Sequence, residues 1–157
     1  MSRKIGQQVM ELALLIGVQA SGKSTFCRDR LFMTHVRINL DMLRTRHRER
    51  QLLETCLRIG QRFVVDNTNA TKSEREPYIA AAKAAHFRVV GYYFQSVIQD
   101  CRRRNEQRPA EYRVPPAGLL GTYAKLELPS RDEGFDELYY VKLSADGFAV
   151  EDWRHEI

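Results

Sequence analysis

The strongest constraint on this chain is a short glycine-rich run that follows an apolar segment. It reads Gly17-Val-Gln-Ala-Ser-Gly22-Lys23-Ser24 and matches the phosphate-binding loop (P-loop) pattern in full. The glycines let the backbone turn its N–H groups onto a β-phosphate, and the positive end of the next helix dipole adds to the attraction. In such loops the lysine reaches the β- and γ-phosphates and the serine hydroxyl ligates Mg²⁺. The run therefore predicts binding of a nucleotide and Mg²⁺.

The P-loop alone does not separate a kinase from a GTPase or a motor. A GTPase needs an Asn-Lys-x-Asp segment and a DxxG switch, and the sequence contains neither. A motor ATPase would need further domains, for which 157 residues leave no room. A kinase that uses ATP is the remaining class. The predicted ATP-binding residues are Gly17, Val18, Gln19, Ala20, Ser21, Gly22, Lys23, Ser24, Thr25, Arg104 and Arg108.

Apolar runs alternate with helical patterns along the chain. Strands are predicted at 9–16, 35–39, 62–66 and 87–95. Helices are predicted at 23–33, 72–86, 97–107 and from 116 to about 126, and a further helical region follows the second strand and continues through 50–61. The stretch 138–153 alternates around Asp146-Gly147 and predicts a closing hairpin. This order predicts an α/β P-loop kinase fold over residues 1–157 as one domain, with a parallel sheet of four to five strands covered by helices on both faces.

Composition favours a cytoplasmic protein. No apolar run approaches the about 18 residues that span a bilayer, and the N-terminal segment lacks a cleavage site for a signal peptide. The three cysteines, Cys27, Cys56 and Cys101, form no CxxC pair and are expected to be reduced. The sequence therefore predicts no membrane association, and it does not define the oligomeric state.

Arginines gather in two places. The net charge is +5, from 25 basic and 20 acidic residues. One group is Arg44, Arg46, Arg48 and Arg50, and the other is Arg102, Arg103, Arg104, Arg108 and Arg113. Arginine binds phosphate oxygens in a bidentate manner, so the second group predicts a lid that closes over the phosphates and excludes water. The alternative for either group is a solvated helix face.

The acceptor side of the site is predicted at the ends of the second and third strands. Asp41 follows the second strand, where a carboxylate can accept the proton of an attacking hydroxyl, with Arg44 on the same helical face. The alternative role of Asp41 is that of an N-cap. Asp66 ends the third strand in the position of a carboxylate that holds Mg²⁺ together with Ser24, followed by Asn67 and Thr68 as contacts to the acceptor. The alternative for this segment is an Asx-turn.

These motifs together resemble the 5′-polynucleotide kinases, over most of the chain. Besides the P-loop they are Asn39-x-Asp-x-x-Arg44, Asp66-Asn-Thr-Asn69, Arg104-Asn-x-x-Arg108 with Val114-Pro115, and Glu133-Gly-Phe-Asp136. The resemblance implies that Lys23, Asp41 and Arg108 are catalytic, with Asp41 as general base. It also implies that Arg44 binds the phosphate beside the acceptor hydroxyl, and that Arg104 and Arg108 clamp the transferring group. Asp66, Asn67 and Thr68 are implied to line the acceptor side. Either Asp66 or Asn67 can make the key contact of its motif.

The substrate implied by the resemblance is the 5′-hydroxyl of a DNA or RNA end. The Asp-x-Asp-x-Thr motif of the phosphatase module often fused to such kinases is missing. The same P-loop subfamily contains kinases for nucleosides, sugars and modified bases in DNA, and a non-catalytic nucleotide-binding module is a third alternative. Asp41 and the lid arginines argue against a mere binder, because a binder needs no base on the acceptor side.

Overall fold

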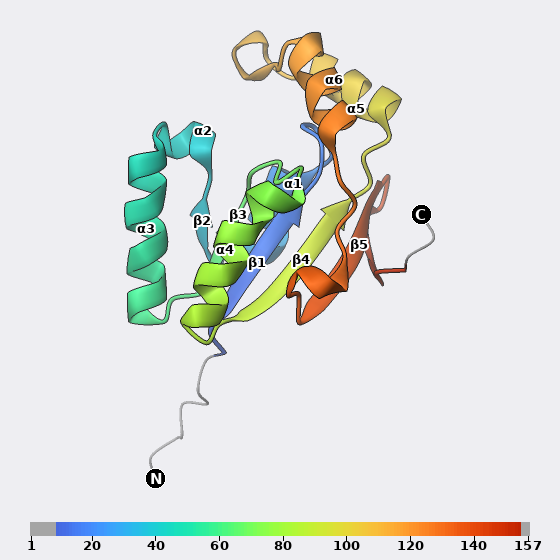
Figure 1. The fold of residues 1–157 in the computed structure, drawn as a ribbon. Coiled ribbons are helices and arrows are strands. Elements are labelled where there is room, and N and C mark those ends of the chain that lie inside the picture. The colour runs from blue at the N-terminus through green and yellow to red at the C-terminus, as the bar shows by residue number, and fades with distance from the viewer. Residues whose placement is uncertain (1–8, 155–157) are drawn as a thin grey trace.

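Six strands form one sheet in the order β2-β3-β1-β4-β5-β6, in a computed structural model that describes residues 9–154 (Figure 1). The strands are β1 (Glu11–Ile16), β2 (Val36–Ile38), β3 (Phe63–Val65), β4 (Arg88–Phe94), β5 (Glu137–Ser144) and β6 (Gly147–Asp152). β1 to β5 pair in parallel, and β6 runs antiparallel to β5. The predicted parallel sheet and closing hairpin are confirmed, and the first hairpin strand is also the fifth parallel strand.

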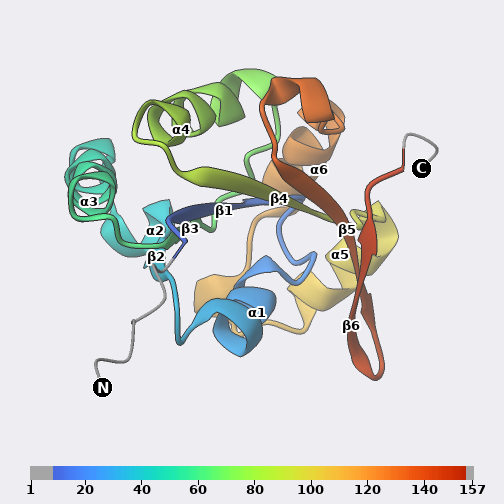
Figure 2. The same cartoon turned by 90° about the horizontal axis from the view of Figure 1, so that it is seen from below.

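Helices lie on both faces of this sheet and at the carboxyl ends of its strands. They are α1 (Lys23–Phe26), α2 (Leu40–Leu43), α3 (Arg46–Ile59), α4 (Lys72–Ala84), α5 (Ile98–Glu106) and α6 (Pro116–Lys125). α3 and α4 cover one face and α1 the other, as the view from below shows (Figure 2). α2, α5 and α6 lie at the end of the sheet toward which the parallel strands run (Figure 1). Within residues 9–154, no helix combines the length and apolarity that a membrane crossing requires.

The alternating residues of β1 explain why both faces are covered. Leu12 and Leu14 are fully buried in a cluster with Tyr78 of α4, whereas Leu15 points the other way and packs with Phe26 of α1. Successive side chains of a strand point to opposite faces, so an uninterrupted apolar strand requires a helix layer on each side. β1 is thus held from both faces, and the loop that follows it starts from a rigid position.

Two helical segments differ from the prediction in detail. The segment 23–33 was expected as one α-helix, but α1 ends at Phe26 and continues as a π-helical turn over Cys27–Leu31. The helical region after the second strand is divided into α2 and α3, because Arg44 takes a positive φ of 75° between them. A side chain with a β-carbon rarely adopts that backbone conformation, and sequence periodicity does not register a single such residue.

Candidate functional site

A cavity of about 160 Å³ lies where the ends of β1, β2 and β3 meet, and we call it the phosphate cavity. Ligands of open parallel sheets bind at this edge, outside the carboxyl ends of the strands. Its lining residues are Gln19, Ala20, Gly22, Lys23, Ser24, Thr25, Asn39, Asp41, Asp66, Asn67, Thr68, Arg108, Tyr112 and Val114. Four separate segments of the sequence are thereby brought to one place: the P-loop, the Asp41 segment, the Asp66 segment and the segment 108–114.

The P-loop is bonded to the segment after β3 at Gly17 and lies next to a ring of β6 at Gly22. The Gly17 N–H donates to the Thr68 carbonyl at 2.9 Å, which ties the loop to the segment after β3. Gly22 has a φ of 104°, and a β-carbon there would lie 3.1 Å from the ring of Phe148 in β6. That ring in turn packs edge-on against Phe26 of α1, with centroids 5.3 Å apart. The loop conformation therefore depends on glycine and on the closing hairpin.

Lys23 lies buried against the loop that it belongs to. Its Nζ donates to the carbonyls of Gly17 and Val18, each at 2.9 Å. Burial lowers the pKa of Lys23 to about 8, while the carboxylate of Asp66 acts in the opposite direction. The ammonium is thus held at the cavity by bonds that a phosphate group can replace.

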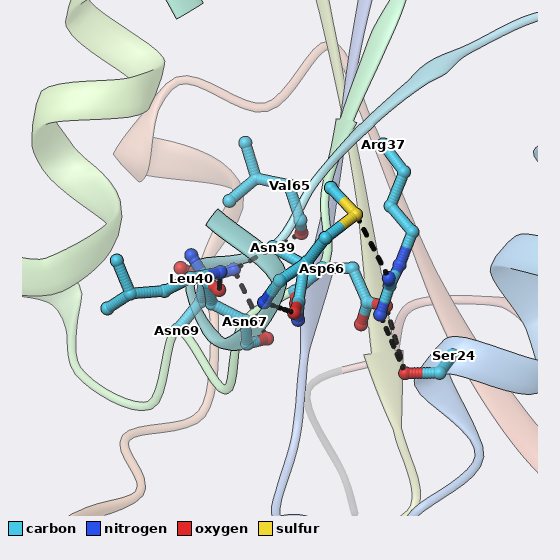
Figure 3. A network of polar contacts seen from close by, with 9 residues as sticks. Ser24, Arg37, Asn39, Leu40, Val65, Asp66, Asn67 and Asn69 are labelled. Atoms are coloured by element: carbon cyan, nitrogen blue, oxygen red, sulfur yellow. Dashed lines mark hydrogen bonds and ion pairs between the residues drawn. The ribbon is translucent and has the colours of Figure 1, made fainter. Parts of the chain in front are cut away.

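Asp66 and Ser24 form the part of the cavity that can hold a divalent cation. The Ser24 hydroxyl donates to Asp66 Oδ2 at 2.9 Å, and Arg37 Nε forms an ion pair with the same oxygen at 2.9 Å (Figure 3). Asp66 is only 2% exposed. Within residues 9–154 no group of three or more His, Cys, Asp or Glu side chains could hold a metal. Two oxygen ligands beside a phosphate site do fit Mg²⁺, which usually takes one or two carboxylates plus substrate phosphates.

Asn39 caps α2, so the interpretation of Asp41 as the N-cap is wrong. Asn39 Oδ1 accepts a hydrogen bond from the Met42 N–H at 2.9 Å, and Asn39 Nδ2 donates to the Asp66 carbonyl at 2.5 Å. Asp41 lies in the first turn of α2, is exposed, and lines the phosphate cavity. Its carboxylate does not cap the helix and is available to a group that enters the cavity.

The side chains of Asp66 and Asn67 bond different parts of the protein. Asp66 bonds the side chains of Ser24 and Arg37 and so does not close an Asx-turn of its own. Asn67 Oδ1 accepts from the Leu40 N–H at 2.9 Å and thereby fixes the start of α2. Thr68 lines the cavity next to it. The side chain of Asp66 is thus bonded to the P-loop serine, whereas that of Asn67 is bonded to the backbone at the start of α2.

The three arginines that the resemblance singled out occupy different environments. Arg108 lines the phosphate cavity. Arg104 of α5 instead donates from Nη1 to the Ala20 carbonyl at 2.9 Å, which links this helix to the P-loop backbone. Arg44 is exposed at the end of α2 and lies outside the lining of the cavity. Of these three arginines, only Arg108 lines the phosphate cavity.

A second cavity, of about 470 Å³, opens beside the first, and sequence reasoning missed it. We call it the side pocket; its lining residues are Leu40, Arg46, Glu49, Arg50, Leu53, Asn67, Thr68, Asn69, Glu74, Pro77, Tyr78 and Lys125. Glu49, only 6% exposed, accepts from the Tyr78 hydroxyl at 2.8 Å and from Arg46 at 3.0 Å. The four-residue spacing of Arg46 and Arg50 was a usable signal. Nothing in the sequence indicated the pairing of α3 with α4 through Tyr78.

Arg37 is the other residue that the motifs did not reveal. It lies in β2 between Val36 and the buried Ile38, and the only signal in the sequence was a charged residue between two apolar residues of a short strand. Its partner Asp66 is 29 residues further along the chain. Motifs report residues that are close in sequence, whereas this pair depends on β2 lying next to β3.

Comparisons with known proteins agree with the fold. A family model described as an AAA domain matches residues 43–129, which is more than half of the chain. The bifunctional polynucleotide phosphatase/kinase of Schizosaccharomyces pombe (strain 972 / ATCC 24843) is 26% identical over 135 residues. That alignment covers 83% of this chain and 33% of the relative, so the chain spans about a third of the relative's length.

Two solved structures have the same arrangement of strands and helices. Kti12 of Chaetomium thermophilum, in complex with ADP-AlF3, matches with a TM-score of 0.66 and 16% identity, over 83% of this chain and 88% of that one. A gluconokinase from Sinorhizobium meliloti 1021 matches with a TM-score of 0.59 and 16% identity, over 88% and 85%. At such identities the likeness concerns the fold alone, which is the α/β fold of P-loop kinases.

Proposed function

The chain belongs to the AAA domain family, and we propose that it transfers the γ-phosphate of ATP to the 5′-hydroxyl of a nucleic acid end. The observation that carries this proposal is the position of Asp41. An exposed carboxylate with no capping duty lines the same cavity as Lys23 and Arg108. A protein that only binds nucleotide needs no base on the acceptor side, whereas a kinase does.

Each residue of the cavity has a distinct role in this reaction. Lys23 leaves the two carbonyls it binds and contacts the β- and γ-phosphates, and Arg108 neutralises charge on the transferring group. Asp41 accepts the proton of the attacking hydroxyl and holds that hydroxyl in line. Ser24 and Asp66 would hold Mg²⁺, which supplies positive charge at the β- and γ-phosphate oxygens. Arg104 keeps α5 against the P-loop through its bond to the Ala20 carbonyl.

Two facts support a nucleic acid as the acceptor. The relative from Schizosaccharomyces pombe is a polynucleotide phosphatase/kinase, and its match covers 83% of this chain. Arginines also gather around the acceptor side, with Arg44 at the end of α2 and Arg46 and Arg50 in the side pocket. Arginine is well suited to the phosphates of a polynucleotide because its planar fork can donate two parallel hydrogen bonds.

A kinase for a small hydroxylated acceptor is the second candidate. The side pocket has a volume of about 470 Å³, within the range of about 300–1,000 Å³ that is typical of small-molecule sites. The fold is shared with a gluconokinase. A sugar or nucleoside in this pocket would reach the phosphate cavity past Asn67 and Thr68, which line both.

The test is transfer of labelled γ-phosphate from ATP to a short 5′-OH oligonucleotide. The matched control is the same oligonucleotide with a 5′-phosphate, which offers no acceptor hydroxyl at that end. Gluconate and a plain nucleoside test the second candidate in the same assay. Label on the 5′-OH strand alone supports the polynucleotide kinase. Label on a small acceptor and none on the oligonucleotide would replace it with the second candidate.

A further inference from the structure

The side pocket adjoins the phosphate cavity and is built from different elements. α3 contributes Arg46, Glu49, Arg50 and Leu53 to its lining, and α4 contributes Pro77 and Tyr78. Asn67 and Thr68 line both cavities. A molecule whose hydroxyl lies at Asp41 would therefore extend past these two residues into the side pocket.

The two arginines of this pocket lie one helical turn apart on the same face of α3. Arg46 Nη1 donates to Glu49 at 3.0 Å and to the Tyr78 hydroxyl at 3.3 Å. Both bonds use one nitrogen, so the rest of that guanidinium is available. Arg50 is exposed and, within residues 9–154, forms no hydrogen bond or ion pair. The pocket thus has one arginine anchored by a buried carboxylate and one arginine with all its donors unused.

The other charges of the pocket are already paired. Glu49 accepts hydrogen bonds from Arg46 and Tyr78, and Glu74 is bound by Lys125 at 2.8 Å. An incoming anion therefore meets Arg50 without having to separate an existing ion pair. Leu53 and Pro77 supply apolar surface beside the arginines. This combination suits a phosphate joined to a sugar better than it suits a neutral polyol.

We propose that the side pocket binds the phosphate next to the reacting hydroxyl of the acceptor, with Arg50 as its principal contact and Arg46 as a second one. The proposal rests on the proposed function and specifies its acceptor class as one that carries a phosphodiester or phosphomonoester. It assigns to α3 the contact that the resemblance assigns to Arg44, which lines neither cavity. Arg50 and Arg46 are specificity residues that recognise the acceptor.

The test compares Arg50→Ala with Arg58→Ala. Arg58 lies on the same helix, is exposed, and is eight residues or about 12 Å further along it, outside the pocket. Steady-state kinetics are measured with a 5′-OH oligonucleotide, a nucleoside 3′-monophosphate and the plain nucleoside. We expect Arg50→Ala to lower kcat/KM at least about tenfold for the two phosphate-bearing acceptors and to lower it much less for the nucleoside, since one charge-assisted hydrogen bond to phosphate is lost. Arg58→Ala should resemble the wild type with all three.

Equilibrium binding provides a readout that does not depend on turnover. The anisotropy of a labelled 5′-OH oligonucleotide is measured at several salt concentrations without ATP. Arg50→Ala should weaken binding and reduce the salt slope by about one phosphate contact relative to Arg58→Ala. Transfer by the wild type combined with equal kinetics of Arg50→Ala and Arg58→Ala would overturn this inference and leave the proposed function intact. Absence of any transfer to the oligonucleotide by the wild type would overturn the proposed function, and equal binding by the two variants would then reject the pocket as well.

Discussion

Lys23 is bonded to its own loop in the free protein. Its Nζ satisfies the carbonyls of Gly17 and Val18, and the side chain is buried. Binding of a triphosphate must therefore exchange two hydrogen bonds to neutral oxygens for contacts with charged ones. The exchange is favourable because the negative charge of a phosphate oxygen attracts the ammonium more strongly than a neutral carbonyl oxygen does.

Replacement of Lys23 by Ala is expected to abolish phosphate transfer without unfolding the protein. The β- and γ-phosphates lose the nearest fixed cation of the P-loop, which acts most strongly in the transition state. The measurement is labelled transfer from ATP, with the thermal unfolding temperature as the control for folding. Transfer at the wild-type rate would show that the loop does not serve the reaction.

Nucleotide binding is expected to take up protons on the alkaline side of the Lys23 pKa. That pKa is about 8 in the free protein, lowered mainly by burial, whereas phosphate oxygens favour the charged ammonium. Above about pH 8 a bound triphosphate should therefore protonate Lys23, and its affinity should fall as the pH rises. Calorimetry in two buffers of different ionisation enthalpy measures the uptake. Lys23→Arg, which stays charged throughout this range, should show none.

The same group contributes to the pH dependence of stability, with a definite sign. Between about pH 8 and pH 10.5, the pKa of an exposed lysine, Lys23 is deprotonated in the folded protein and protonated in the unfolded chain. The unfolded state then binds more protons, so the contribution of Lys23 to the free energy of unfolding rises with pH through this window. Below about pH 8 the residue is charged in both states and its contribution no longer changes.

Asp41→Asn is expected to lower kcat at least about 100-fold and to leave ATP binding nearly unchanged. The amide keeps the shape of the side chain but cannot accept the proton of the acceptor hydroxyl. Asp132→Asn is the matched control, because Asp132 is also exposed in the first turn of a short helical segment and lies outside both cavities. Turnover of Asp41→Asn at the level of Asp132→Asn would remove Asp41 from the mechanism.

At the scale of the elements, the sequence predicts those helices and strands that have a periodic apolar pattern and those motifs whose residues are contiguous. The strand-helix order and the P-loop follow from apolar runs and from one continuous motif, and the structure confirms both. The division between α2 and α3 was not predictable, because it depends on the single backbone angle of Arg44. The side pocket was missed because it depends on α3 and α4 lying side by side. Glu49 and Tyr78 are 29 residues apart, and no pattern in either helix marks them as partners.

Tyr78→Phe is expected to destabilise the protein by about 1.5–3 kcal/mol, the scale of one hydrogen bond to a charged group. Glu49 would lose the hydroxyl that donates at 2.8 Å while remaining buried between α3 and α4. Urea unfolding measures the change in the free energy of unfolding. Tyr123→Phe is the control, since Tyr123 is 46% exposed on α6. An equal effect of the two substitutions would mean that the hydroxyl of Tyr78 does not support the pocket.

At the scale of the whole molecule, one buried arginine joins segments that are far apart in the sequence. Arg75 of α4 is fully buried, and its guanidinium donates to both carboxylate oxygens of Glu133 at 2.8 and 3.2 Å. It also donates to the carbonyls of Asn69, Ala70 and Glu127. The loop after β3, the segment after α6 and the turn before β5 are therefore held by a single side chain. A side chain without donors cannot replace the guanidinium in these bonds.

Arg75→Ala is expected to cost about 3–5 kcal/mol of stability, because it leaves a partly buried carboxylate without its partner. The carbonyls of Asn69 and Glu127 lose the donation from Arg75 at the same time, and the Ala70 carbonyl keeps only the Glu127 N–H. Lys72→Ala on the same helix is the control, since an exposed substitution usually changes stability by no more than about 0.5 kcal/mol. Chemical denaturation of both variants gives the comparison. A change for Arg75→Ala within the range of the control would show that the three segments are held by other contacts.

The support of Gly22 by Phe148 also sets an order of events during biosynthesis. The ribosome makes the P-loop early and β6 much later, and chains begin to fold while they are being synthesised. A nascent chain that has not reached β6 carries the full P-loop sequence but lacks the ring that packs behind Gly22 and against Phe26. The phosphate cradle therefore takes its final packing only after translation has passed residue 148, although its own residues emerge first.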